Sequence, residues 1–149
     1  MLVMSILLLS TAQGAGAVDS GNLAATWSWR GLIVSAQARY DVPAGLIQSV
    51  MAIESGGQAN ALSSAGAIGL MQVMPGHFSS GQNPWDPATN IDVAAQILRG
   101  CEDAAGGWHP GDNWVPAINC YATGHVVQGW TSYASTVHAV WVQLAAEGA

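Results

Sequence analysis

The stretch that follows Pro43 constrains the fold of this chain more than any other part of the sequence. It reads AGLIQSVMAIES, and on a helix its large apolar side chains would cover most of the circumference: Leu46, Ile47, Val50, Met51 and Ile53. Proline is common at the first helical position, so Pro43 suits the start of this helix. A helix that is apolar on nearly every side is stable in water only when other elements surround it. We therefore expect a fold built around this helix.

The rest of the sequence shows helical spacing of apolar residues and little that is typical of strands. Further helices are predicted at four places: over 28–40, after a cap at Thr89 or Asn90, over 116–124, and from Thr131 or Ser132 onward. The last of these buries one face, formed by Val137, Val140, Trp141 and Leu144. With 149 residues, no repeat and no low-complexity tract, the prediction is a single all-α domain.

Charge is scarce in this sequence. Only 8% of the residues are charged, with three arginines, no lysine and nine acidic residues. The net charge of −6 leaves no basic patch for phosphates, so nucleic acid is excluded as a partner. The missing lysine excludes P-loops and lysine Schiff-base chemistry. The histidines at 77, 109, 125 and 138 and the two cysteines lack the spacing of a zinc site, so neither a metal nor another cofactor is expected.

The N-terminal residues 1–17 are typical of an export signal. A short apolar run is followed by small residues and by Ala15-Gly16-Ala17, which fits a signal-peptide cleavage site, although a positive n-region is missing. The run is too short to cross a bilayer, so no stable membrane span is expected in the mature chain. Residues 18–149 would then be the domain, exported to the periplasm or the cell exterior. A buried helix, or the cut edge of a larger protein, is the alternative.

Cys101 and Cys120 are the two cysteines of the chain. In an exported protein an even pair is typical of a disulfide, which would join the end of one predicted helix to the middle of the next. Such a bridge stabilises a fold by about 3 kcal/mol for a loop of this size. The alternative is two buried thiols that act as small apolar residues.

Glu54 is the one carboxyl group in an unusual place. It shares a helix face with Ile47, Val50 and Met51, and it lies at the C-terminal end of the helix that should be buried. Burial and the helix dipole both disfavour its charged form, so we expect its pKa to be raised, as a general acid near neutral pH requires. The alternative is a solvated glutamate that only ends the helix.

Four blocks of sequence surround this glutamate in a fixed order: Glu54-Ser55, then GLMQVMP over 69–75, DPATNI over 86–91, and an aromatic-x-x-Gly block at Tyr121 to Gly124. In these blocks the sequence resembles the soluble lytic transglycosylase (SLT) domain, a lysozyme-like family that cleaves peptidoglycan. The resemblance extends over about 44–141. It implies a lysozyme-like all-α fold.

The resemblance also implies roles for five residues. Glu54 would be the catalytic acid. Ser63 and Gln72 would lie against the sugar or the acid, and Met74 would line the saccharide groove. Tyr121 would donate a hydrogen bond from its hydroxyl to the catalytic acid.

The block that follows Cys120 departs from the family pattern. The family's Tyr-Asn-Ala-Gly is here Tyr-Ala-Thr-Gly, so Ala122 replaces the asparagine. Asn119 could compensate for it, although its expected place is the helix surface. This version of the block, followed by Tyr133, also resembles relatives from conjugation, type IV secretion and pilus-assembly systems.

The activity implied by the resemblance is that of a peptidoglycan lytic transglycosylase, acting as a monomer on glycan strands. It would cleave the β-1,4 bond between MurNAc and GlcNAc without water and leave a 1,6-anhydromuramic product, with one glutamate as acid and then base. A single convincing carboxyl candidate fits this scheme better than a two-carboxylate mechanism. Two alternatives stay open: a hydrolytic muramidase, and a non-catalytic wall-binding component of a secretion or phage apparatus. A protein of a phage apparatus would be virion-associated.

Seven tryptophans remain to be placed. Flat aromatic rings stack on sugars at little entropic cost. The candidates for this role are those in predicted loops, namely Trp85, Trp108 and Trp114. For the others, packing at helix ends or in the core is expected: Trp27, Trp29, Trp130 and Trp141.

Overall fold

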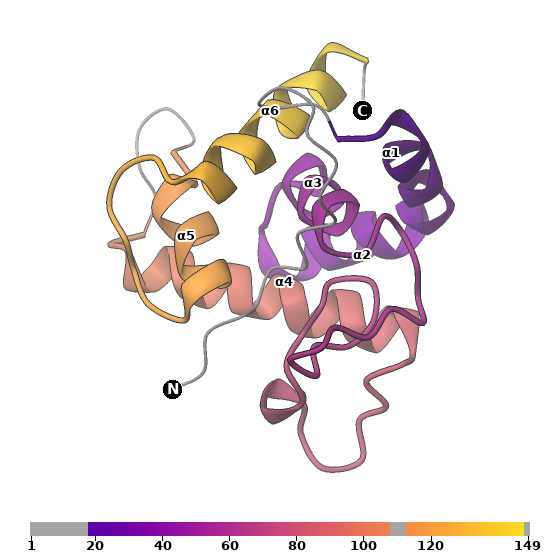
Figure 1. Ribbon diagram of the computed structural model, residues 1–149. Helices are drawn as coiled ribbons and strands as arrows, with labels where there is room; N and C mark the ends of the chain where they lie inside the picture. The colour runs from indigo at the N-terminus through magenta and orange to yellow at the C-terminus, as the bar shows by residue number, and fades with distance from the viewer. Residues whose placement is uncertain (1–17, 108–112, 148–149) are drawn as a thin grey trace.

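The computed structural model describes residues 18–107 and 113–147, and this part of the chain is helical without strands (Figure 1). The α-helices are α1 (Ser20–Thr26), α2 (Arg30–Tyr40), α3 (Ala44–Glu54), α4 (Pro87–Ala104), α5 (Val115–Thr123) and α6 (Ser132–Ala146). Two short 3₁₀ turns complete them, η1 (Trp27–Trp29) and η2 (Pro75–His77). The expected all-α class is therefore confirmed. The predicted export signal at 1–17, and Trp108 and His109, lie outside the described residues.

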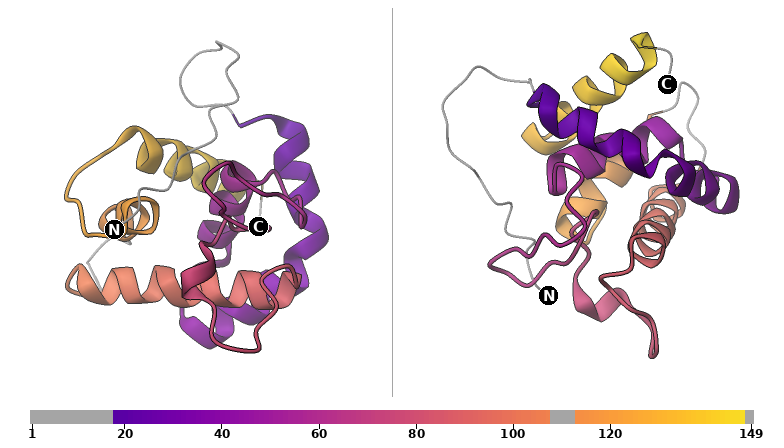
Figure 2. Two further views of the ribbon diagram at one scale, coloured as in Figure 1. Left: turned by 60° about the horizontal axis from the view of Figure 1, so that its bottom comes forward. Right: turned by 90° about the vertical axis from the view of Figure 1, so that its right-hand side faces the viewer.

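Helix α3 lies at the centre of the fold, as its apolar circumference predicts. It packs against α1, α2 and α6, and a seven-residue stretch of it from Leu46 to Ala52 is buried. Figure 2 shows α4 crossing one side of the domain, where it contacts α2 and α5. Helix α3 is therefore packed between other helices, and its last residue is Glu54.

The helix boundaries differ from the expected ones at several places. Helix α1 was not predicted, because Leu23 is the one large apolar residue that it buries. Helix α4 begins three or four residues earlier than expected: Asp86 accepts a hydrogen bond from the Thr89 N–H, so Asp86 is the cap and not Thr89 or Asn90. Pro43 precedes α3 as its N-cap instead of occupying its first turn.

A disulfide joins Cys101 of α4 to Cys120 of α5, with the two Cα atoms 5.7 Å apart. Both sulfurs belong to buried residues that also pack in the main core. The bridge fixes α5 to α4 close to Tyr121, the next residue along the chain. The two cysteines thus form the disulfide expected for an exported protein and are not free thiols.

Asn90 fixes the loop between α3 and α4 from inside the protein. Its side chain is buried, its Nδ2 donates to the carbonyls of Ile68 (2.9 Å) and Pro84 (3.0 Å), and its Oδ1 accepts from the Met71 N–H (2.9 Å). Gly69 faces this amide with a φ of 75°, and a Cβ there would lie 2.6 Å from the Asn90 Nδ2. The glycine is required both by its backbone conformation and by the closeness of Asn90.

We expect Asn90→Ala to lower the free energy of unfolding by about 2–4 kcal/mol, because one buried and two part-buried backbone groups lose their partner. Urea unfolding followed by circular dichroism measures this change. Gln96→Ala, an exposed position on the same helix, is the matched control and should stay within about 0.5 kcal/mol of the parent protein. Equal losses in the two variants would contradict a specific role for the Asn90 amide.

Candidate active site

Glu54 is the last residue of α3, and the turn after it is built to place its side chain. The Ser55 hydroxyl donates to the Leu70 carbonyl (2.7 Å) and accepts from the Gly57 N–H (3.1 Å). Gly57 has a φ of 80°, and a Cβ on it would lie 3.0 Å from the backbone of Ala25 in α1. The helix therefore stops where it does because α1 packs against a turn that only glycine can form.

The Glu54 carboxyl group lies in an apolar environment with one strong hydrogen-bond donor. Burial raises its pKa from 4.5 to about 7, and the Tyr133 hydroxyl, which donates to its Oε1 at 2.5 Å, acts in the opposite direction. Burial and the Glu54 charge in turn raise the pKa values of Tyr121 and Tyr133 well above the usual range, so both phenols stay protonated. A carboxyl group with a pKa near 7 can donate a proton and take it back at neutral pH.

The segment that contains Leu70, Met71 and Gln72 is held against this site from three sides. Ser55 binds the Leu70 carbonyl, Asn90 accepts from the Met71 N–H, and the Tyr121 hydroxyl donates to the Met71 carbonyl at 2.7 Å. The sequence blocks at 54–55, 86–91 and 121–124 therefore hold the block at 69–75 in place. Gln72 is held in a left-handed conformation (φ 49°), which is strained for a residue with a side chain, and such strain is concentrated at functional sites.

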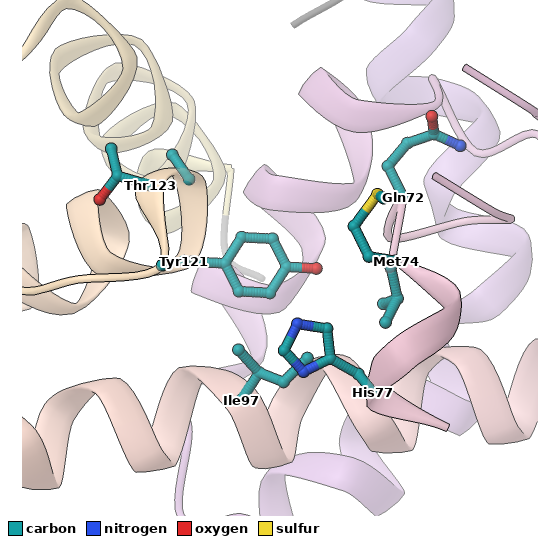
Figure 3. Close-up of a pocket in the computed structure, with 9 residues that line it drawn as sticks. Gln72, Met74, His77, Ile97, Tyr121 and Thr123 are labelled. Carbon is teal, nitrogen blue, oxygen red and sulfur yellow. The ribbon is translucent and has the colours of Figure 1, made fainter. Parts of the chain in front are cut away.

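A pocket opens beside this segment and is shown in Figure 3. Gln72, Met74 and Tyr121 are in its lining, with Tyr121 pointing across from α5 toward the other two. The remaining lining residues are Val73, His77, Ile97, Ala122, Thr123 and Gly124. Glu54 is outside this set but lies close enough to Tyr121 for its charge to raise the pKa of that phenol. The pocket is thus lined by both apolar and polar side chains, none of them a carboxylate, and it lies next to Glu54.

A sequence model of the transglycosylase SLT domain matches residues 31–138, which include Glu54, the strained loop and both tyrosines. The chain belongs to this family. Two curated relatives show the same similarity. The SLT domain is 32% identical to the membrane-bound lytic murein transglycosylase E of Buchnera aphidicola subsp. Acyrthosiphon pisum (strain APS), over 48% of this chain and 38% of the relative. It is 38% identical to the transglycosylase of Enterobacteria phage PRD1, over 48% of this chain and 28% of that protein. The chain thus spans well under half the length of either relative.

The tyrosine that donates to the acid of this SLT domain is Tyr133 and not Tyr121. The predicted hydrogen bond from Tyr121 to the acid was wrong, because the Tyr121 hydroxyl donates to the Met71 carbonyl; a contact of Tyr121 with substrate stays a prediction. Tyr133 lies one turn before Val137 on the buried face of α6, and that face also includes Val140 and Leu144. Extending the apolar spacing of the last helix by one turn toward its start would have found it.

Two further residues of the SLT domain have structural roles that the sequence did not predict. The Ser63 hydroxyl accepts from the Ala67 N–H (2.9 Å), which closes a tight loop; the predicted contact with sugar stays a prediction. Asn119 is buried and not on the helix surface, and its Nδ2 donates to the carbonyls of Val127 and Gly129, both at 2.8 Å. It therefore holds the loop between α5 and α6.

The described tryptophans divide differently from the expected pattern. Trp114 was a candidate for sugar stacking but is only 8% exposed and packs in the core. Trp130 was expected to pack, yet it is 60% exposed. Trp85 is 43% exposed, as expected for a loop residue. Sequence position alone could not separate these cases, since exposure depends on which helices cover each ring.

Four of the other described carboxyl groups have partners away from Glu54. Asp86 and Asp19 cap helices, and Asp103 pairs with Arg99. Asp92 pairs with Arg39 and accepts from the Tyr40 hydroxyl. Within 18–107 and 113–147, no group of three or more His, Cys, Asp or Glu residues could hold a metal ion. In the same ranges, no helix is both long enough and apolar enough to cross a membrane.

Proposed function

We propose that this protein is a peptidoglycan lytic transglycosylase that cleaves the β-1,4 bond between MurNAc and GlcNAc without water. The observation that carries the proposal is the Glu54 carboxyl group, which burial gives a pKa near 7, at the end of a central helix and beside a pocket. Membership of the SLT family and the names of the two relatives support the same activity.

In the first step Glu54, protonated, gives its proton to the glycosidic oxygen, and the bond from that oxygen to the muramic C1 breaks. The substrate's own N-acetyl group assists this departure. In the second step the Glu54 carboxylate takes the proton of the muramic 6-hydroxyl, whose oxygen attacks C1 and closes the anhydro ring. Glu54 ends protonated, so the cycle is balanced and consumes no water.

The electrostatics of the site favour this scheme over hydrolysis with two carboxylates. A retaining glycosidase places its two carboxyl groups about 5–5.5 Å apart, and an inverting one about 6.5–9.5 Å. The raised pKa of Glu54 comes from burial alone, with no contribution from a second described carboxylate. A single carboxyl group suffices when the substrate supplies the nucleophile.

The masses of the products test this function. Purified peptidoglycan is digested with the protein, and the released muropeptides are analysed by mass spectrometry. The proposal predicts muropeptides with anhydromuramic ends, lighter by one water than the hydrolytic products. Reducing-end muramic acid as the sole product would show a hydrolytic muramidase, and no release at all would support a non-catalytic wall-binding component.

The pH dependence of the reaction follows from the same carboxyl group. Glu54 must be protonated to begin the cycle, and burial raises its pKa to about 7. We therefore expect kcat/KM to be maintained up to about pH 7 and to fall about tenfold per pH unit above it. Initial rates between pH 4.5 and 9 measure this. A decline that begins near pH 4.5, the usual carboxyl value, would contradict the buried acid.

The proposed substrate is in the bacterial wall, so the protein would act outside the cytoplasm, as the predicted export signal at 1–17 also suggests. The phage transglycosylase among the relatives supports association with a virion as the other setting. Detecting the protein in separate culture-supernatant, periplasmic and virion fractions would distinguish these locations.

A further inference from the structure

A second cavity, which we call the aromatic cavity, lies between the start of α5 and one side of α6. It is lined by Trp114, Trp130, His138 and Trp141, by the amide of Asn113 and by two aliphatic residues of α5. Its volume is about 270 Å³, near the lower end for small-ligand sites. It shares no lining residue with the pocket beside Glu54 and contains no acidic or basic side chain other than the imidazole.

The rings of the aromatic cavity are ordered by contacts with one another. The His138 imidazole packs edge-on against Trp130, with centroids 5.0 Å apart, and against Trp141 at 6.5 Å. Trp114 is buried, with the Arg99 guanidinium 5.9 Å from the centroid of its ring. Trp130 is 60% exposed, and it packs against His138, whose ring also contacts Trp141.

The backbone that carries Trp130 is also fixed. Asn119 donates to the carbonyls of Val127 and Gly129, and its Oδ1 accepts from the Thr131 hydroxyl at 2.6 Å. The Thr131 hydroxyl in turn accepts from the Ala134 N–H at the start of α6. The backbone on both sides of Trp130 is thus held in place by hydrogen bonds. A large apolar ring held in water by a rigid loop is typical of a binding site.

The chemistry of the lining selects the class of ligand. Flat rings match the apolar face of a pyranose, and the Asn113 amide, the imidazole and the indole N–H groups can bond to hydroxyl and acetamido groups at its edge. The cavity lacks the arginine or lysine that an anionic ligand would need and the carboxylate that a cation would need. An uncharged, polyhydroxylated ring satisfies all of these conditions.

One loop connects the aromatic cavity to the pocket beside Glu54. The loop that ends at Trp130 begins at Gly124, which lines the pocket beside Glu54. We propose that the aromatic cavity is a second saccharide-binding site, which holds an N-acetylated pyranose of the glycan strand on which the catalytic pocket acts. This inference rests on the proposed function, because it takes its polymer from there. The site would keep the protein attached to the wall between cuts.

Nuclear magnetic resonance tests the site directly. The full chain with Glu54→Gln is titrated with a soluble β-1,4-linked N-acetylglucosamine tetrasaccharide while the indole N–H resonances are followed. We expect saturable shifts at Trp130 and Trp141. Trp130→Ala should remove the shift at Trp141 and weaken binding to insoluble peptidoglycan about tenfold, which is the order of one lost aromatic contact.

Two further variants keep the test decisive. His138→Ala removes the ring between the two indoles and should also weaken wall binding, while Val142→Ala, an exposed apolar position on the same helix outside the cavity, should not. The proposal is overturned if the indoles stay unshifted while residues around Tyr121 respond to the sugar. It is also overturned if the indoles respond only to protein concentration, since that would show contact between two copies of the chain.

Failure here is separable from failure of the proposed function. Trp130 shifts with the tetrasaccharide, together with an absence of anhydromuramic products, would refute the activity and leave a sugar site. Anhydromuramic products with wild-type wall binding by Trp130→Ala would refute the second site and leave the activity.

Discussion

Replacing Glu54 by glutamine is expected to lower the rate of peptidoglycan cleavage by about 10³-fold or more. The side chain acts twice in the proposed cycle, as acid and as base, and a positioned acid–base group contributes about 10²–10⁴-fold. Glutamine keeps the shape of the side chain and can still accept from the Tyr133 hydroxyl, so the site should stay assembled. Release of soluble muropeptides measures the loss.

The stability of this variant provides the control for folding. Burial raises the pKa of Glu54, so its charged form is disfavoured in the folded state, and stability is lost as pH rises from 4.5 through about 7. Glu54→Gln should therefore be at least as stable as the parent protein at pH 8. Glu147→Gln, at an exposed position near the end of α6, is the matched control and should keep full activity. Residual cleavage above a tenth of the parent rate in Glu54→Gln would exclude this residue as the acid.

Tyr133→Phe is expected to lower activity about 10- to 100-fold, the equivalent of losing a hydrogen bond to a charged group, about 1.5–3 kcal/mol. The Tyr133 hydroxyl lowers the pKa of Glu54, so its removal should raise that pKa further above 7. The decline of kcat/KM at high pH should then move to higher pH. A pH profile separates this effect from general damage, which would lower the rate without moving the decline.

Tyr121→Phe is the matched comparison, since it removes a phenol that is also buried next to Glu54. Its hydroxyl donates to the Met71 carbonyl, so the variant should lose about 1–3 kcal/mol of stability and leave the high-pH decline in place. Urea unfolding and the same pH profile record both outcomes. If Tyr121→Phe moved the decline and Tyr133→Phe did not, the assignment of the two tyrosines would be reversed.

The central features of the fold could be predicted because they depend on local spacing. The apolar circumference of 44–54 requires a buried helix, and the position of Glu54 on it requires a carboxyl group in an apolar environment. The pKa of about 7 agrees with that argument. The close approach of α1 to Gly57, in the turn after Glu54, depends on tertiary packing and not on local spacing.

The remaining features depend on how distant helices cross. Tyr121 and Tyr133 both lie on buried helix faces, and the angle between α5 and α6 decides which hydroxyl reaches Glu54. Asn119 falls on a short helix whose polar residues give no sign of burial, and its partners lie in the loop that follows. Trp130 remains exposed because none of the described residues covers it, and the spacing of residues in the sequence cannot predict this.

The central claim is that Glu54 works with a nucleophile from the substrate and not with water. Digestion of peptidoglycan in water enriched with oxygen-18 tests this most directly, because every hydrolytic cut places one solvent oxygen on the new muramic end. The account predicts anhydromuramic ends of normal isotopic mass, with no oxygen-18 at C1. Muramic ends that carry one oxygen-18 atom per cut would contradict it.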